Sequence, residues 1–376
     1  MIHKKKHMTN TEKKIYRIIS DEPLISQIEL AHRANISRSS ASVHISNLIK
    51  KGYIAGRGYV ISEYESVVII GAAMIDLYGK SFDPILNNES NPGQVSIHPG
   101  GVSRNISENL ARLGIKVDLI TSICDDPFGK IIKNSCDELG IDLTHSYFLE
   151  NEVSTIYMAI LDHEGEMQMA LSDTGALDKM PMEHIIKKEG AINRGEVIVM
   201  DASLPKEIMR YVVNNHKDKK IIIDPVSIGK AHKLVDFIGM FHTVKCNKNE
   251  AEFLSQTKIS DHDSLVTATQ VLLDQGVEQV FITLGADGVF YRNKKDMGYQ
   301  ETLVTSLVNV TGAGDAFTAG VAYCTLSNMD IKKTAHFATA MSSFSLESMR
   351  AVNPNISLHE INQRLENHHK EDKDVI

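Results

Sequence analysis

One segment of the sequence, Val308–Gly320 with the residues VNVTGAGDAFTAG, places a carboxylate directly behind a glycine turn. Gly312 and Gly314 let backbone N–H groups crowd together, and the helix predicted to follow begins with N–H groups that have no intrahelical acceptor. Together they form a seat for an anion such as a phosphoryl group. A carboxylate with no part in the reaction would only repel a phosphate bound there. We therefore interpret Asp315 as the base that accepts a proton from a hydroxyl attacking that phosphate. The alternative is that Asp315 only caps the helix.

The composition is that of a folded protein with one large core and a small additional domain: 376 residues, of which 42% are hydrophobic and 23% charged. No apolar run is long enough to span a membrane, and the charged start MIHKKKHMTN has no apolar segment behind it, which predicts no signal peptide. The cysteines form no CxxC motif, which predicts reduced, mostly buried thiols in a cytoplasmic protein. They are Cys124, Cys136, Cys246 and Cys324.

Charge is distributed unevenly along the chain. Residues 1–60 hold 11 Lys+Arg and 4 Asp+Glu, a balance of +7, and the other residues hold 29 and 44, a balance of −15, which gives the total of −8. A basic segment attached to an acidic body suggests two functions. The basic segment suits a polyanion, whereas the acidic body does not.

Residues 1–62, the head, predict a small helical domain that ends in a hairpin. One helix is predicted over 11–21, a second begins after Ser26 as its N-cap, and a third covers 37–52 and stops at Gly52. A short hairpin follows over 53–62. In the third helix we expect Val43, Ile45 and Leu48 to face inward, and Arg38, Ser39, Ser40, Ser42, His44 and Asn47 to lie largely outward.

This pattern resembles a winged helix-turn-helix domain, in which the third helix enters the DNA major groove and the hairpin is the wing. The resemblance implies that Arg38, Ser39 and Ser40 at the front of that helix contact duplex DNA, with Arg57 in the wing. The alternative is a helical module for protein interaction or dimerisation.

From residue 65 to about 360 the sequence predicts an α/β domain, followed by a charged tail over 361–376. ESVVIIGAAMIDL is expected to be one continuous buried strand, and strand-like and helical segments alternate after it, which predicts a mostly parallel sheet. Ligands of such sheets bind where strands end, and Asp76, Asn247, Gly285 and Asp315 all follow strand-like segments, Asp315 after SLVNV. NPGQVSIHPG and the hairpin STIYMAILDHEGEMQMALSD predict a small β-sheet that covers the pocket as a lid.

Four motifs along this domain point to one family. The sequence has no GxxxxGK[ST] phosphate loop, but it contains GGVSRN at 100–105, NKNE at 247–250, LGADG at 284–288 and NVTGAGD at 309–315. Their order and spacing resemble the ribokinase-like (PfkB) carbohydrate and nucleoside kinases from about Val67 to about Pro354. The resemblance implies a three-layer α/β core with a β lid, and ATP and Mg²⁺ as cofactors.

The resemblance also implies roles for individual residues. Asp315 would take the proton of the primary hydroxyl of the substrate, while the backbone N–H groups of an anion hole hold the phosphoryl group. Glu250 would orient water on Mg²⁺. The anion hole would comprise Gly312, Ala313 and Gly314, and the residues on the ATP side would be Asn247, Thr283, Gly285 and Gly288. For Asn247 and Glu250 the alternative is a loop amide followed by an acid in the first turn of a helix.

On the acceptor side, Asp76, Gly100, Gly101 and Asn105 resemble the sugar site of the family. The alternative for Asn105 is a helix residue whose hydrogen bonds are satisfied locally. Many members carry Asp two residues before the Thr-Gly-Ala-Gly turn, where it helps to bind a monovalent cation. This chain has Asn309 there, and because an amide binds K⁺ more weakly than a carboxylate, the resemblance leaves activation by K⁺ open.

Within the family, the segments 90–114, 154–167 and 308–317 are most similar to pseudouridine kinases. The implied acceptor is then the ribose 5′-hydroxyl of pseudouridine, with the lid contacting the base. The candidates for that contact are Thr155, Tyr157, His98, Ser172 and Asp173, and the alternative for Thr155 and Tyr157 is that they are ordinary strand residues.

Two other functions fit the sequence. One is a ribokinase or another nucleoside or sugar kinase, and the other is a transcription regulator that uses the kinase fold only to sense a ligand. A pure sensor needs no base, so Asp315 favours a kinase, and a kinase that also binds DNA, as a homodimer, accounts for every feature.

Overall fold

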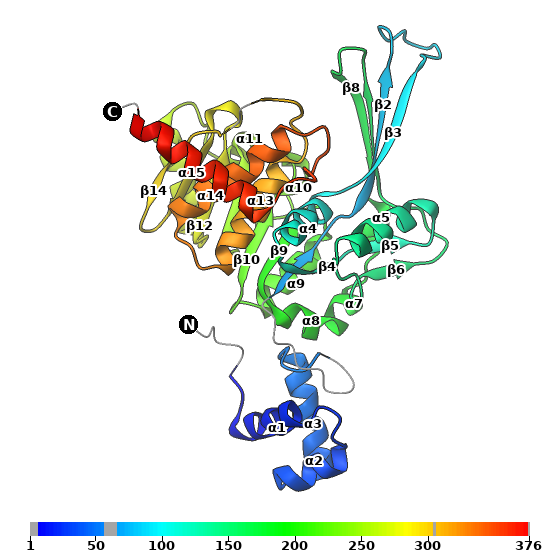
Figure 1. The fold of residues 1–376 in the computed structure, drawn as a ribbon, viewed down its shortest axis with the longest axis vertical. Helices are drawn as coiled ribbons and strands as arrows, with labels where there is room; N and C mark the ends of the chain where they lie inside the picture. The colour runs from blue at the N-terminus through cyan, green and yellow to red at the C-terminus, as the bar shows by residue number, and fades with distance from the viewer. Residues whose placement is uncertain (1–6, 56–65, 304–305, 375–376) are drawn as a thin grey trace.

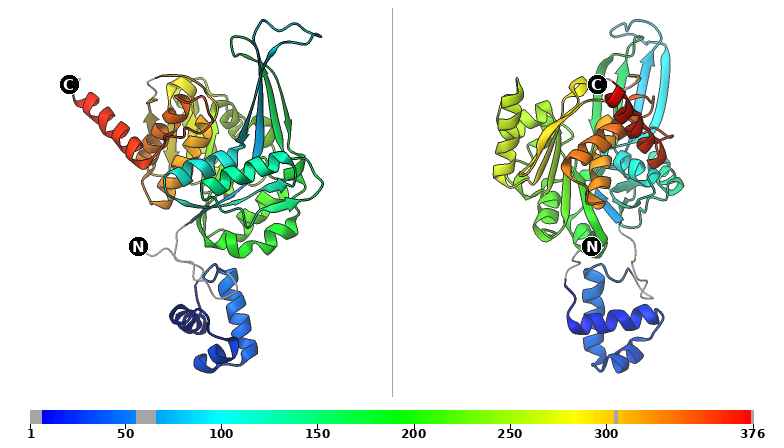
Figure 2. Two further views of the ribbon diagram at one scale, coloured as in Figure 1. Left: turned by 45° about the vertical axis from the view of Figure 1, so that its right-hand side comes forward. Right: turned by 60° about the vertical axis from the view of Figure 1, so that its left-hand side comes forward.

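The computed structural model describes residues 7–55, 66–303 and 306–374 (Figure 1). A small helical head lies at one end, an α/β body in the middle, and a narrow β-sheet rises from the body as a lid (Figure 2). Among the described residues no helix is both long and apolar enough to cross a membrane.

The head folds around its own apolar core. Its helices are α1 (Asn10–Asp21), α2 (Gln27–Ala34) and α3 (Arg38–Lys50). Each follows a hydroxyl N-cap, and the buried side chains between them include Ile15, Ile19, Leu30, Ile45 and Leu48. The expectation that Val43 faces inward is wrong, because Ala41, Ile45 and Leu48 form the buried stripe and Val43 is 58% exposed. The predicted wing, with Arg57, lies mostly outside the described residues.

The head contacts the body at the C-terminal end of α3. Asn193 in α8 (Glu189–Arg194) donates a hydrogen bond from Nδ2 to the carbonyl of Lys50. Two glycines permit this approach, because a Cβ on Gly190 would lie 2.9 Å from the carbonyl oxygen of Ile49, and one on Gly52 would lie 2.9 Å from the nitrogen of Arg194. The backbones of head and body are therefore directly packed against each other (Figure 1).

The body is built on an eight-stranded sheet with the order β14-β13-β12-β11-β10-β9-β1-β4. The strands from β12 to β4 are parallel, and β13 and β14 add an antiparallel edge, which confirms the predicted mostly parallel sheet. The bounds are β1 (Ser66–Ile70), β4 (Lys116–Ile120), β9 (Gly195–Asp201), β10 (Lys220–Asp224), β11 (Thr243–Asn247), β12 (Gln279–Thr283), β13 (Val289–Asn293) and β14 (Met297–Gln300). A separate parallel pair is formed by β5 (Ser122–Cys124) and β6 (Tyr147–Leu149).

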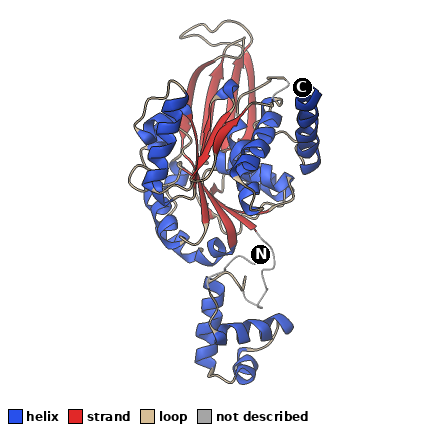
Figure 3. Cartoon of the chain, turned by 90° about the vertical axis from the view of Figure 1, so that its left-hand side faces the viewer, coloured by secondary structure: helices blue, strands red, loops and turns tan. Residues whose placement is uncertain are grey.

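Helices cover both faces of this sheet and give the three-layer arrangement seen in Figure 3. Alternate residues of the strands enter two different apolar clusters, one on each face, which explains why apolar residues follow one another along the strand segments. One face is covered by α9 (Lys206–Asn215), α11 (Lys248–Ser255) and α12 (His262–Gln275), with the short α6 (Gly175–Asp178), α7 (Met182–Lys187), α8 and α10 (Ile228–Ala231). The other is covered by α4 (Val102–Arg112), α5 (Pro127–Glu138), α13 (Ala313–Leu326), α14 (Ile331–Leu346) and α15 (Leu358–Asp374).

The lid is a four-stranded sheet with the order β3-β2-β7-β8. Its strands are β2 (Met74–Ser81), β3 (Gly93–Gly100), β7 (Ile156–Leu161) and β8 (Met167–Asp173). The expectation of one continuous strand from residue 65 to 77 is wrong, because the chain leaves the main sheet after Ile70 and joins the lid at Met74. Gly71 lies at this break, and a Cβ there would lie 2.1 Å from a carboxylate oxygen of Asp201.

The expected boundary between body and tail falls inside α15. Ile361 is fully buried in the apolar cluster, and Arg364 forms an ion pair with Glu347 at 2.7 Å. Residues 361–368 therefore belong to the folded body and are not a separate charged tail.

Candidate active site

The glycine turn forms the start of a helix, as predicted. α13 begins at Ala313, its N-cap is Gly312 with a φ of 83°, and its first N–H groups have no acceptor within the helix. Glycine is required at 312 because a Cβ there would lie 2.0 Å from the carbonyl oxygen of Ala351. At Gly314 a Cβ would lie 2.8 Å from Nζ of Lys245, so the missing side chain leaves the turn open above an ammonium group.

The segment before this turn differs from the prediction. Residues 306–310 of SLVNV form a loop, and Leu307 and Val310 are exposed. The loop is held by the backbone N–H of Val308, which donates to Leu346, and by Asn309, whose Oδ1 accepts from the N–H of Thr311 at 3.0 Å. The anion-binding turn is thus positioned by contacts with the last residue of α14 and, at Gly312, with Ala351 in the loop that follows, and residues 306–310 form no strand.

Asp315 lies in the first turn of α13 and reaches α4, which carries one of the residues expected on the acceptor side. Its Oδ2 accepts a hydrogen bond of 2.8 Å from Nδ2 of Asn105 in α4, a residue that is 4% exposed. Burial, followed by the charge of Asp224, raises the pKa of Asp315 to about 7. A carboxyl with a pKa near neutrality can accept and release a proton under ordinary conditions, as a general base must.

A buried ion pair that the motif analysis did not identify lies beneath the anion-binding turn. Nζ of Lys245 contacts Oδ2 of Asp224 at 3.0 Å, and the Thr318 hydroxyl donates to the same oxygen at 3.0 Å. Burial alone would lower the pKa of Lys245, but the carboxylates of Asp224, Glu250 and Asp315 outweigh it, so the pKa is raised and the lysine stays charged. Lys245 therefore places a positive charge below the predicted phosphoryl seat.

Asp76 lies in β2 beside this center. A Cβ on Gly100 would lie 2.2 Å from Oδ2 of Asp76, and one on Gly101, whose φ is 95°, would lie 2.6 Å from the carbonyl oxygen of Ala72. Gly100 is therefore needed for close packing against the carboxylate, and Gly101 for close packing against the backbone of Ala72. Burial raises the pKa of Asp76 to about 6, against the positive charge of Arg104, which lowers it.

The register of the lid aligns the candidates for base contact in one cross-strand row. His98 in β3 pairs with Asp76, Asp76 pairs with Tyr157 in β7, and Tyr157 pairs with Ser172 in β8. Cross-strand partners project from the same face of a sheet, so these side chains share one face. Thr155 is buried just before β7, and its carbonyl accepts from the N–H of Ile75 at 3.0 Å.

Two further residues of the lid, Asp173 and Tyr78, lie near this row. Asp173 ends β8, and its Oδ1 accepts from the N–H of Gly175 at 2.9 Å. The motif analysis did not identify Tyr78, whose pKa is raised by burial and by the charges of Asp76 and Asp315. Tyr78 therefore lies close to both carboxylates.

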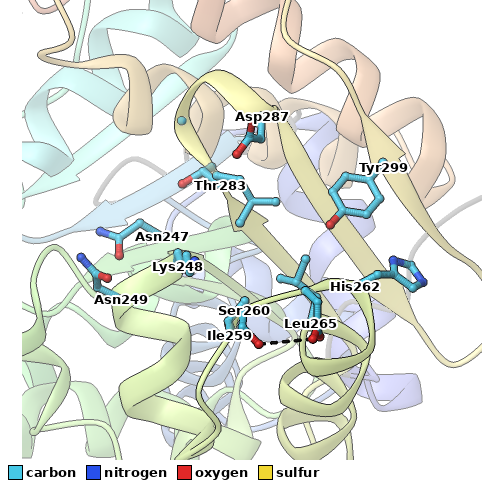
Figure 4. Close-up of a pocket in the computed structure, with 13 residues that line it drawn as sticks. Asn247, Lys248, Asn249, Ile259, Ser260, His262, Leu265, Thr283, Asp287 and Tyr299 are labelled. Atoms are coloured by element: carbon cyan, nitrogen blue, oxygen red, sulfur yellow. Dashed lines mark hydrogen bonds between the residues drawn. The ribbon is translucent and has the colours of Figure 1, made fainter.

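A separate open pocket of about 410 Å³ lies at the ends of β11 and β12 (Figure 4). Three of the residues expected on the ATP side, Asn247, Thr283 and Gly285, line it, together with His262 and Tyr299, which the motifs did not reveal. Gly288 is not one of the lining residues. Its φ is 85°, and its missing Cβ makes room for the carbonyl oxygen of Gln300, so it serves the turn between β12 and β13.

Asn247 and Glu250 form a capping box at the start of α11. Oδ1 of Asn247 accepts from the N–H of Glu250 at 2.9 Å, and a carboxylate oxygen of Glu250 accepts from the N–H of Asn247 at 2.8 Å. Glu250 is 2% exposed, and burial and the charge of Asp224 raise its pKa. The carboxylates of Glu250 and Asp224 offer hard oxygen atoms of the kind that Mg²⁺ prefers as ligands, directly or through water.

Comparison with known proteins places the body in a family. A family model described as pfkB family carbohydrate kinase matches residues 64–357, which is most of the chain. The chain belongs to the pfkB family of carbohydrate kinases. A second model, described as winged helix-turn-helix DNA-binding, matches residues 8–55 and confirms the resemblance of the head.

The sequences of individual relatives match nearly all of the body. The chain is 32% identical to the pseudouridine kinase of Escherichia coli K12 over 81% of this chain and 98% of that protein. It is 31% identical to an uncharacterized sugar kinase of the same organism, YeiI, over 93% of this chain and 97% of that protein. So little of the chain lies outside this second match that the match must extend into the head.

Solved structures show the same fold. A protein of Clostridium perfringens designated a sugar kinase is 35% identical, with a TM-score of 0.73 over 81% of this chain and 97% of that one. A protein of Escherichia coli designated a ribokinase II, solved with ATP and Mg²⁺, is 18% identical, with a TM-score of 0.69 over 81% of this chain and 100% of that one. The ribokinase-like fold predicted from the motifs is confirmed.

Proposed function

We propose that this kinase transfers a phosphoryl group from ATP to the ribose 5′-hydroxyl of pseudouridine and forms pseudouridine 5′-phosphate. The observation that carries the proposal is the hydrogen bond between Asp315 and Asn105, which brings the base on the anion-binding turn against the acceptor side. Similarity to the pseudouridine kinase of Escherichia coli supports the choice of nucleoside. The lid row of His98, Tyr157 and Ser172 offers acceptor and donor groups for the ring N–H groups of a C-linked uracil.

In this mechanism Asp76 and Asn105 hold the ribose hydroxyls, so that the 5′-hydroxyl lies beside Asp315. The carboxylate of Asp315 accepts the proton of this hydroxyl as the oxygen attacks the terminal phosphorus of ATP. The N–H groups at the start of α13 hold the transferring group, and Lys245 below them stabilises its negative charge. No covalent intermediate on the protein is required.

ATP would occupy the pocket of Asn247, Thr283 and Gly285, with its phosphates toward α13. Glu250, through water, and Asp224 would hold Mg²⁺, which when bound neutralises charge on the phosphates.

Replacing NaCl by KCl in the assay tests activation by K⁺. We expect this activation to be small, because Oδ1 of Asn309 already accepts a hydrogen bond from the N–H of Thr311.

The deciding experiment measures ATP-dependent phosphorylation of pseudouridine, uridine, inosine, ribose and fructose by the full-length protein. We expect the highest kcat/KM for pseudouridine. A clear preference for ribose or fructose would instead identify a sugar kinase, and absence of turnover on every acceptor with ATP and Mg²⁺ would favour a ligand-sensing regulator.

We also infer that the head binds duplex DNA. The support is the match to a winged helix-turn-helix model and the exposed face of α3, where Arg38, Ser39, Ser42 and Val43 are all exposed. Arg38 and the serines suit phosphates and base edges, and Val43 suits the methyl group of thymine. A titration of the full-length protein with its own upstream DNA, with and without pseudouridine, tests this. Lack of salt-dependent affinity for any duplex would indicate a protein-interaction module.

A homodimer formed through the lid is the third part of the proposal. The lid face opposite the row of Asp76 exposes a continuous set of apolar side chains, and a second copy of the same sheet would bury them. They are Val95, Ile97, Met158, Ile160, Met169 and Leu171. Light scattering of wild type and Leu171→Asp tests this. If the wild type is a dimer formed through the lid, Leu171→Asp should dissociate it; if the wild type is a monomer, the substitution should leave its mass unchanged.

A further inference from the structure

Arg104 is a buried cation directly beside the acceptor site. It lies in α4, next to Asn105 in the chain, and is 4% exposed. Its Nη2 forms an ion pair with Glu108, while its Nη1 donates to the carbonyl of Pro99 at 3.1 Å and to Oδ1 of Asn105 at 3.0 Å. A buried guanidinium is costly unless its hydrogen-bonding fork is used, and here it joins three groups around the site.

The contact with Asn105 fixes which end of the amide faces the reaction. Only the oxygen of an amide accepts a hydrogen bond, so Arg104 holds Oδ1 on its own side and turns Nδ2 away from itself. Nδ2 then donates to Oδ2 of Asp315 at 2.8 Å. A flipped amide would place Oδ1 against the carboxylate of Asp315, where two acceptors repel each other, and would leave Arg104 facing an NH₂ group.

The same guanidinium also acts on the second acceptor residue. Burial raises the pKa of Asp76 to about 6, and among the charged groups around that carboxyl it is Arg104 that lowers it. An ionised Asp76 accepts hydrogen bonds from sugar hydroxyls. One buried arginine therefore orients the amide and favours the charged carboxylate that together line the acceptor side.

We propose that Arg104 is a positioning residue that prepares Asn105 and Asp76 to bind the acceptor hydroxyls; this rests on the acceptor placement proposed above. It acts through these two residues, without contacting the transferring phosphoryl group. Its loss should weaken acceptor binding and alignment and leave ATP binding unchanged.

The chain offers a matched control in Arg112. Both arginines pair with Glu108 and both lie on α4, but Arg112 contacts the carbonyl of Pro354 on its far side and does not reach Asn105. We expect Arg104→Met to raise the KM for the nucleoside and lower kcat/KM about 10- to 100-fold, the worth of a hydrogen bond to a charged group. The KM for ATP should change less than about twofold, and Arg112→Met should leave both KM values near wild type.

If Arg104→Met does not fold, Arg104→Met with Glu108→Gln removes the charge left behind and gives the same comparison. Equal increases in both KM values for the Arg104 variants, or equal effects of Arg104→Met and Arg112→Met, would show a structural role only and overturn the proposal.

A double-mutant cycle with Asn105→Ala separates this proposal from the one on which it rests. We expect Arg104→Met to cost much less in kcat/KM in the Asn105→Ala background than in wild type, because its main contact is gone. Additive costs would overturn the positioning role. If Asn105→Ala alone leaves the acceptor KM unchanged, the acceptor site itself is misplaced; if it raises that KM while Arg104→Met does not, only the inference on Arg104 fails.

Discussion

The variant Asp315→Asn is expected to be a much poorer enzyme and a more stable protein. Asparagine keeps the size of the side chain, and its oxygen can still accept the hydrogen bond that Asn105 donates to Asp315. It cannot accept the proton of the acceptor hydroxyl, so kcat should fall about 10²- to 10⁴-fold. The KM for ATP should stay near that of wild type, because the pocket of Asn247 and Thr283 is unchanged.

The gain in stability comes from removing a carboxylate that the fold holds in an unfavourable place. The difference between the ordinary pKa of 3.8 and the raised pKa of about 7 corresponds, at about 1.4 kcal/mol per pH unit, to about 4 kcal/mol. Because the side chain is partly exposed, solvent screens part of this cost. We therefore expect the free energy of unfolding of Asp315→Asn to exceed that of wild type by about 2 kcal/mol at pH 8.

This gain should depend on pH with a definite sign. Between about pH 4 and pH 7 the folded wild type binds a proton at Asp315 that the unfolded chain does not bind, so wild-type stability rises as the pH falls through this window. Asp315→Asn has no such proton, and its advantage should shrink from pH 8 to pH 5. Urea unfolding at both pH values and kcat at pH 8 measure the two effects. Near-wild-type kcat, or an equal stability advantage at both pH values, refutes the reasoning.

The other predictions concern the phosphate side and the head. Lys245→Met should raise the KM for ATP and destabilise the protein by about 3–5 kcal/mol, because Asp224 is left buried without its cation. Steady-state kinetics measures the first effect and urea unfolding the second, and the absence of either effect would contradict the prediction. Glu250→Gln keeps an oxygen for the capping hydrogen bond but should raise the Mg²⁺ concentration needed for half-maximal activity; an unchanged Mg²⁺ titration makes Glu250 a cap only. Arg38→Ala should lower the slope of log affinity for DNA against log salt by about one contact, and an unchanged slope removes Arg38 from the DNA contacts. A chain starting at residue 64 should keep full kcat. It should lose about 1 kcal/mol of stability, because the hydrogen bond between Asn193 and Lys50 is absent. A large drop in kcat would show that the head supports the site.

Much of the body could be predicted because its strands are buried on both faces. Segments such as TVKCN and QVFITLGADG contain apolar residues and end in polar or glycine residues, and the structure places their ends at the pocket of Asn247, Thr283 and Gly285. The head was predictable for a different reason. Ser26 and Ser37 mark the starts of helices by capping them, and these marks depend on neighbouring residues alone.

The incorrect predictions arise where distant residues decide the local structure. The apolar run from residue 65 to 77 gives no sign that it changes sheets, and the carboxylate of Asp201 that packs against Gly71 at the break lies 130 residues away in the sequence. SLVNV has the composition of a strand, but the last residue of α14, Leu346, supplies the carbonyl that accepts from the N–H of Val308. Val43 is as apolar as its buried neighbours, and only the packing of α3 against the other two helices shows that it faces outward.

The buried cations of the site leave no signal in the sequence, yet they act on the two carboxyl groups beside them. Lys245 stands in the middle of a strand pattern, and only the fold pairs it with Asp224 beneath the turn that carries Asp315. Asp224 raises the pKa of Asp315 and Lys245 lowers it, so the base is held near pH 7 by this pair as well as by burial. A base with a pKa near the working pH combines a large ionised fraction with a strong tendency to take the proton. On the acceptor side Arg104 acts in the same way on Asp76. The fold therefore places a cation, which the motifs did not reveal, beside each carboxylate that we propose to face the substrate.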